Sequence, residues 1–289
     1  MITHGIYKIK FGSASPGQHT FFCDAGLKLS VINNSYIWTA ANGSSIEIVQ
    51  SQDPGLIEVQ WASSQGNADF LDVNGVLHTF RSDVALAEVL DQDTETNTFA
   101  HKHRINQQVS THDLTVPCAI AHVAVFTPDI NASCELFKKI GFVVSDSVAG
   151  KAIFMRSKSN NPHHQILLAQ SLDKTGLHHA ALAVNDIYSV VTKGLHMASQ
   201  GWKTVLGPGR HVISSSTHWY FDTDLGSFEL SADEDYLTSE WTPTEYDPAT
   251  LVAYEWAIEG GLDPVSRRQV GATQLTKTIH QPKHIVDKS

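Results

Sequence analysis

The second half of the chain carries one pattern twice. The segment AHVAVFTPDI (121–130) aligns with HHAALAVNDI (178–187), and the alignment places His122 against His179, 57 residues further along. In each copy the histidine is followed by a run of apolar residues that is typical of a β-strand. We therefore predict that this half of the chain folds as two similar modules.

A helix is predicted after each of these strands. Asp129 and Asp186 occupy the same place in the two copies, where an aspartate side chain can accept the free N–H groups of a helix start. Apolar residues then recur at helical spacing up to Gly141 in the first copy and Gly201 in the second, and glycine is a common helix stop. Three strand-like runs follow each helix, so the predicted unit is β-α-β-β-β and the fold class is α+β.

The first 100 residues show a weaker version of this pattern. GIYKIKFG is typical of a strand, SPGQHTFFCDAGLKLS could form a helix, and IWTAANGSSIEIVQ favours a hairpin that turns at Asn42-Gly43. The polar stretch 91–113 has no periodicity and is predicted to link the two halves. After about residue 246 the pattern fades, which indicates a tail or a strap across another surface.

Composition argues against several classes of partner. With 42% hydrophobic and 17% charged residues, a chain of 289 residues can bury a core. A net charge of −10 without a lysine or arginine cluster argues against nucleic acid or anionic lipid as a partner, and no apolar run is long enough to span a membrane. The three cysteines lack zinc-ligand spacing and the N-terminus lacks an apolar signal stretch, so we expect a cytoplasmic protein.

Histidine, with sixteen copies, is the unusual residue in this composition, and it is the commonest metal ligand. His122 and His179 lie at matching points of the two modules, and Glu229 lies in the last predicted strand, SFELSA. Two imidazoles and one carboxylate on one face of a metal form the triad typical of non-haem iron(II) oxygenases. Three metal positions then stay open, which suits the two adjacent oxygens of a catechol together with dioxygen.

Further histidine and tyrosine residues accompany these ligands. PHHQILLA places His164 fifteen residues before His179, GRH ends at His211, and THWYFDTDLG contains Tyr220. Together with the ligands, these motifs resemble those of the type I extradiol dioxygenases, which are ring-cleaving enzymes of the vicinal-oxygen-chelate (glyoxalase/dihydroxybiphenyl dioxygenase) superfamily. The resemblance covers roughly residues 116–236.

The resemblance implies a domain plan and a cofactor. It implies two half-barrel-like domains of β-α-β-β-β modules, with residues 1–115 as a degenerate metal-free domain and linker. Residues 116–245 would form the catalytic metal-binding domain and residues 246–289 a C-terminal tail. The implied metal is Fe(II), with Mn(II) as the alternative, and the implied partners are a catecholic substrate and O2. We also expect a homo-oligomer.

Roles for three side chains follow from the resemblance and from the chemistry of ring cleavage. Forming a catecholate requires the loss of protons, and a neutral histidine can take and return one near pH 7, so His164 is the expected acid–base residue. Tyr220 and His211 are expected to hydrogen-bond the substrate oxygens. His178 is expected to point to the opposite face of its strand, because side chains alternate along a regular strand.

One departure from the family pattern concerns the third ligand. The family has three residues between a glycine and the ligand glutamate, whereas here two residues separate Gly226 from Glu229. A shift of one residue turns the side chains of a strand to its other face, unless the turn absorbs it. Asp233 and Glu234 are the alternative carboxylates nearby.

Two other functions are compatible with the same motifs. An epimerase or isomerase of the same superfamily would use four metal ligands, and Gln165 could be the fourth. Four protein ligands leave two open positions, which suits proton transfer on a chelated carbonyl rather than oxygen activation. A non-catalytic protein that binds a small molecule on this fold would need an apolar pocket and no metal ligands.

Overall fold

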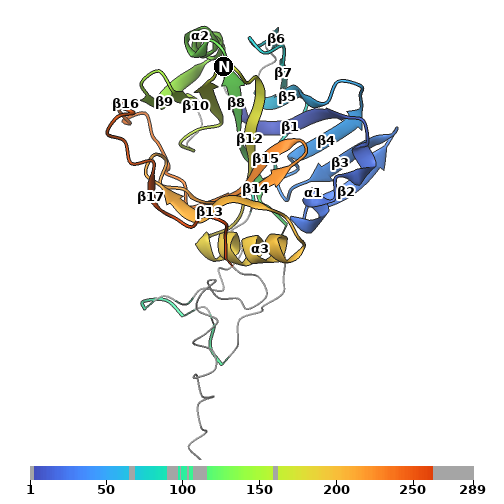
Figure 1. The fold of residues 1–289 in the computed structure, drawn as a ribbon, viewed down its shortest axis with the longest axis vertical. Coiled ribbons are helices and arrows are strands. Elements are labelled where there is room, and N and C mark those ends of the chain that lie inside the picture. Colours follow the sequence, from blue (N-terminus) through green and yellow to red (C-terminus); the bar gives the residue numbers. More distant parts are fainter. Residues whose placement is uncertain are drawn as a thin grey trace, which may run out of the picture.

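The computed structural model shows an α+β fold with two β-sheets, as the sequence predicts (Figure 1). Among the residues that it describes, no helix is long and apolar enough to cross a membrane. Most of the predicted linker at 91–113 and everything from residue 263 onward lie outside these residues. The described residues are 3–64, 69–89, 97, 99–102, 104–106, 116–158 and 162–262.

The N-terminal sheet has seven strands in the order β2-β3-β4-β1-β5-β7-β6. The elements from β1 to β4 form one complete module, in which β1 pairs in parallel with β4 and the β3–β4 hairpin surrounds the predicted Asn42-Gly43 turn. The predicted helix is only partly present, because its last residues form β2. The elements are β1 (Thr3–Ser13), the 3-10 turn η1 (Pro16–Gln18), α1 (Phe21–Asp24), β2 (Lys28–Ile32), β3 (Ser35–Thr39), β4 (Ser45–Gln50), β5 (Gly55–Ser63), β6 (Phe70–Leu71) and β7 (Leu77–Arg81).

The second sheet has ten strands in the order β16-β9-β10-β11-β8-β12-β15-β14-β13-β17. It contains both copies of the sequence repeat, and the first strands of the two copies, β8 and β12, lie side by side at its centre. The elements are β8 (Ala119–Thr127), α2 (Ile130–Lys139), β9 (Phe142–Val148), β10 (Ala152–Ser157), β11 (Ile166–Gln170), β12 (Gly176–Ala183), α3 (Ile187–Ser199), β13 (Thr204–His211), β14 (Thr217–Thr223), β15 (Gly226–Ala232), β16 (Thr244–Tyr246) and β17 (Tyr254–Ala257).

Both repeat helices begin at the predicted aspartates. The side chain of Asp129 accepts a hydrogen bond from the backbone N–H of Ala132, and Asp186 does the same for Ser189, at 2.9 and 2.7 Å. Each bond satisfies one of the N–H groups that a helix start leaves without a partner. The helices α2 and α3 pack against β9–β11 and β13–β15 respectively, so the opposite face of the curved sheet is free to form a pocket.

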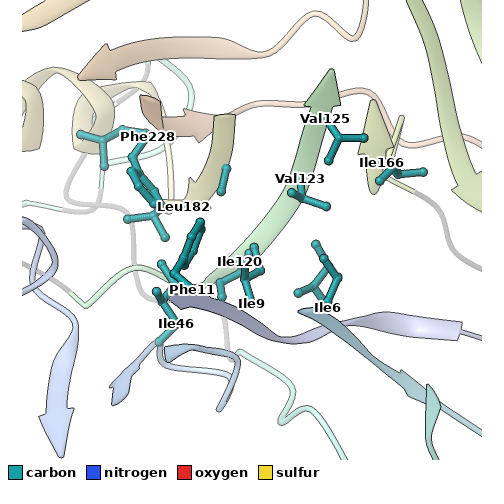
Figure 2. Close-up of a cluster of buried hydrophobic side chains, with 14 of the residues drawn as sticks. Ile6, Ile9, Phe11, Ile46, Ile120, Val123, Val125, Ile166, Leu182 and Phe228 are labelled. Carbon is teal, nitrogen blue, oxygen red and sulfur yellow. The ribbon is translucent and has the colours of Figure 1, made fainter. Parts of the chain in front are cut away.

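A single hydrophobic core joins the two sheets. Figure 2 shows Ile6, Ile9 and Phe11 of β1 beside Ile120 of β8 and Phe228 of β15. All five side chains are buried. The N-terminal half therefore packs against the face of the second sheet that lies opposite the pocket.

The segment after residue 246, which the sequence predicts to be a tail or a strap across another surface, contributes β17 to the ten-stranded sheet. Thr244–Tyr246 pairs with β9 at one edge of the sheet, and Tyr254–Ala257 pairs with β13 near the other edge. The chain between these two strands therefore crosses from one edge of the curved sheet to the other (Figure 1). The predicted domain boundaries stay predictions.

Candidate metal centre and active-site pocket

The three predicted metal ligands come from three neighbouring strands. His122 lies on β8, His179 on β12 and Glu229 on β15, and β12 is hydrogen-bonded to both other strands. Their exposed fractions are 2%, 4% and 1%. In the antiparallel pairing of β12 with β8, His179 lies opposite Ala124, two residues from His122. The parallel register of β12 with β15 places Glu229 opposite Ala181 and so brings the glutamate near both histidines.

The donor atoms of these residues lie close together. His122 Nε2 is 2.9 Å from His179 Nε2, and Glu229 Oε2 is 3.2 Å from the first nitrogen and 3.5 Å from the second. Two metal–ligand bonds of roughly 2.1 Å at right angles place neighbouring donor atoms about 3 Å apart. The cluster therefore has the dimensions of one face of an octahedral metal site.

The polar groups of the cluster fit a divalent cation. Both oxygens of Glu229 are buried and have no hydrogen-bond partner among the described residues, so the 3.2 Å approach of His122 is a close contact without hydrogen-bond geometry. Burial by itself would raise the pKa of Glu229, but His122 and the other nearby histidines lower it to about 2. Burial holds the pKa of His179 well below its usual value. An ionised carboxylate without a donor, beside a neutral imidazole, is the state that binds metal.

Glu229 faces the pocket although only two residues, instead of three, separate it from Gly226. Thr223 pairs with Gly226, so only two residues connect β14 and β15, and Tyr220 then lies directly opposite Glu229. Side chains of directly opposed residues share one face of a sheet. The two-residue turn between β14 and β15 therefore leaves Glu229 on the pocket face, beside Tyr220.

Neither of the two alternative carboxylates belongs to the cluster of His122, His179 and Glu229. Asp233 forms an ion pair with Arg210 at 2.7 Å. Glu234 forms a second group of possible ligands with His122 and His164, but its Oε1 already accepts a hydrogen bond from the backbone N–H of His164 at 3.2 Å. Among the described residues Glu229 has no such partner, so the first cluster is the one that offers an unpartnered carboxylate.

His164 lies beside the cluster and Gln165 points away from it. The ring of His164 lies 4.1 Å from that of His122, and both rings line the same cavity. Burial holds the pKa of His164 well below its usual value, which favours the neutral form. The side-chain oxygen of Gln165 accepts a hydrogen bond from the backbone N–H of Ser157 at 2.9 Å, and Gln165 does not line the cavity.

His211 and Tyr220 form a hydrogen-bonded pair on the other side of the cluster. His211 Nε2 is 3.0 Å from the Tyr220 hydroxyl and 4.0 Å from Glu229 Oε1. Burial lowers the pKa of His211 and raises that of Tyr220 well above its usual value, so the tyrosine keeps its proton and can donate it in a hydrogen bond. The rings of His218 and Tyr254, which no sequence motif indicates as site residues, pack on His211.

The expectation for His178 is wrong. His178 lines the cavity together with His179, and the two Nδ1 atoms are 2.7 Å apart. The register between β12 and β8 shifts between Leu177 and His179, and such a bulge interrupts the alternation of side chains. Two consecutive histidines therefore face the same side.

The cluster lies in a cavity of about 310 Å³, at the lower end of the range in which proteins hold small molecules. Apolar side chains from both modules and from the segment that crosses between β16 and β17 form its walls. None of the described residues that line it is a lysine or an arginine. The apolar wall residues are Val148, Phe154, Leu167, Val205, Leu206, Ile213, Leu251 and Ala253.

The region that holds the cluster also matches a known superfamily by sequence. Residues 119–229 match the Glyoxalase/Bleomycin resistance protein/Dioxygenase superfamily, which is the superfamily that the motifs predict. The chain therefore contains a domain of this superfamily, and the matched residues include all three proposed metal ligands.

Particular relatives are dioxygenases and a glyoxalase. Metapyrocatechase 2 of Cupriavidus necator is 31% identical over 145 residues, which are 49% of this chain and 45% of that protein. The match thus spans less than half of that relative's length. The Mn(II)-bound glyoxalase from Novosphingobium aromaticivorans has a TM-score of 0.73 at 18% identity, over 90% of this chain and 93% of its own. The 2,2′,3-trihydroxybiphenyl 1,2-dioxygenase from Sphingomonas wittichii has a TM-score of 0.69 at 13% identity, and the match covers 90% of this chain and 99% of that protein's chain. At these identities the two structures show a shared fold.

Proposed function

We propose that this protein is an Fe(II)-dependent extradiol dioxygenase that cleaves the ring of a catechol with O2. The observation that carries the proposal is the buried group of His122, His179 and Glu229, with its carboxylate free of hydrogen bonds, inside an apolar cavity. Iron is favoured because two histidines and one carboxylate are the ligands of non-haem iron(II) oxygenases, and Mn(II) is the alternative. The partial match to metapyrocatechase 2 supports the same reaction.

His122, His179 and Glu229 would hold the metal, and a redox-active metal there would supply the electron transfer between catechol and dioxygen that ring cleavage requires. The residues around it prepare the substrate. His164, held neutral, can take a proton from a catechol hydroxyl, while Tyr220 and His211 can donate hydrogen bonds to oxygen atoms of the substrate. The apolar walls can exclude water and contact the ring. Because no cation lines the described cavity, we expect catechols without a carboxylate to be the better substrates.

Oxygen uptake tests the proposed reaction. Protein purified anaerobically and loaded with one Fe(II) per chain is expected to consume one O2 per catechol and to incorporate both atoms, measured with an oxygen electrode and with ¹⁸O2 by mass spectrometry. The control is the Zn(II)-loaded protein, since zinc has no redox chemistry and should support no uptake. An iron-loaded protein that consumes no O2 with any of a panel of alkyl, aryl and unsubstituted catechols would contradict the proposal.

The epimerase alternative depends on Gln165 as a fourth ligand. Because the Gln165 side chain is bonded to Ser157, we expect Gln165→Ala to keep its full metal content. The variant should lose about 1–3 kcal/mol of stability, since the buried N–H of Ser157 loses its acceptor. Metal analysis and urea unfolding measure the two effects. A loss of metal in this variant would favour the epimerase, and a wild-type protein without any metal affinity would favour a binding protein.

A further inference from the structure

Glu234 reaches His164 because the chain turns sharply after β15. Asp233, the second residue after Ser231, adopts a left-handed conformation with φ of +59°, and its carboxylate pairs outward with Arg210. The next side chain, Glu234, then points the other way and meets His164. Glu234 Oε1 lies 3.0 Å from His164 Nδ1.

The proton on His164 can be assigned from this contact. The same oxygen, Oε1, accepts a hydrogen bond from the backbone N–H of His164 at 3.2 Å, and a backbone N–H can only donate. Burial raises the pKa of Glu234 to about 7, but a protonated carboxyl group keeps one acceptor oxygen. The carbonyl oxygen of a carboxylic acid is a better acceptor than its hydroxyl oxygen, so the backbone N–H favours Oε1 as the acceptor oxygen in both states. His164 Nδ1 then carries the hydrogen that it shares with Oε1.

A second neighbour of His164 requires the same assignment. His163 Nδ1 lies 3.2 Å from His164 Nδ1, and His163 Nε2 lies 2.9 Å from a carboxylate oxygen of Asp146. Neutral imidazole has one donor and one acceptor nitrogen. Because the carboxylate needs a donor, His163 carries its hydrogen on Nε2 and its Nδ1 is an acceptor. Both groups that face His164 Nδ1 are thus acceptors.

We propose that Glu234, with the Asp146–His163 pair behind it, is a positioning residue that holds His164 as the Nδ1–H tautomer. His164 lines the cavity, and this tautomer leaves the lone pair of Nε2 available to take a proton from the substrate. The inference rests on the proposed function for its catalytic meaning. Glu234, an alternative metal ligand by sequence, thereby has a separate task beside the metal cluster.

Two substitutions of Glu234 separate hydrogen bonding from mere filling of space. Glu234→Leu removes the acceptor and is expected to lower kcat about 10–100-fold, the usual effect of losing a group that orients an active histidine, while KM and iron content stay near wild type. Glu234→Gln keeps an acceptor oxygen at the same place and should recover most of the lost kcat. Asp233→Asn, a neighbouring change on the outward side, should match wild type. If Glu234→Leu turns over like wild type, or if Gln recovers nothing, the proposal is overturned.

A measurement without turnover tests the tautomer directly. In metal-free protein with ¹⁵N-labelled histidine, the His164 ring should show its hydrogen on Nδ1 by NMR, and Glu234→Leu should shift the population toward Nε2–H. A wild-type His164 with its hydrogen on Nε2 would overturn the proposal. A wild-type enzyme that cleaves no catechol would instead contradict the proposed function, and the NMR result would still decide the inference.

Discussion

Glu229→Ala is expected to abolish tight metal binding. Its carboxylate is the only anionic donor of the cluster formed with His122 and His179, and the pKa of Glu229, lowered to about 2, keeps it ionised at neutral pH. Removal of a residue that merely orients a ligand typically costs 10–100-fold in metal affinity. Loss of a charged ligand should cost more, so we expect Kd to rise by at least about 100-fold.

Metal titration of apoprotein by calorimetry, with Mn(II) as an air-stable substitute for Fe(II), measures this effect. The wild type should bind one ion per chain. Glu234→Ala is the matched control, because it removes the carboxylate of the second possible cluster and is expected to keep the ion. If Glu234→Ala loses the ion while Glu229→Ala keeps it, the metal lies between His122, His164 and Glu234, and the assignment of Glu229 is wrong.

His164→Ala is expected to keep its iron and to lose most of its turnover. The residue lies beside His122 rather than within the group of three ligands, and its low pKa keeps it neutral. General acid–base groups contribute about 10²–10⁴-fold to rate, so kcat should fall by about that factor.

Iron content by metal analysis and single-turnover rates with excess catechol separate the two roles of His164. Because the substitution also removes a buried ring, the midpoint of thermal unfolding should be recorded beside the rates, and Leu167→Ala serves as a control that widens the cavity without removing an acid–base group. That control should change KM more than kcat. A His164→Ala protein that lacks iron would place His164 among the ligands instead.

The sequence could predict the elements that depend on neighbours along the chain. The aspartates that start α2 and α3 act on N–H groups three residues away, and the apolar periods depend on which face of a helix or strand is buried. The positions of His122 and His179 follow from the same logic. Equivalent residues of two repeated strands lie near each other when the strands pair about a local two-fold axis, so the repeat favours a common site for two of the three proposed ligands, and the strand register completes it.

The rest of the site depends on contacts between segments that are distant in the sequence. Glu229 faces the pocket because a two-residue turn sets the register of β15, and His178 does so because β12 bulges against β8. Register is decided by the pairing partner and by turn geometry. A strand pattern alone could not show either outcome.

Orientation of polar side chains was likewise decided by the tertiary structure. Gln165 points away from the cluster because the N–H of Ser157 on β10 needs an acceptor there, and Glu234 meets His164 across 70 residues of sequence. The segment after residue 246 lines the cavity with Leu251 and Ala253 because the strands on either side of it, β16 and β17, pair with opposite edges of the sheet. The sequence by itself thus determined the modules, their helices and two proposed histidine ligands, since these follow from local patterns and a repeat. The tertiary structure decided the third ligand's facing and the partner of His164, because hydrogen bonds and strand register join residues that the sequence holds apart.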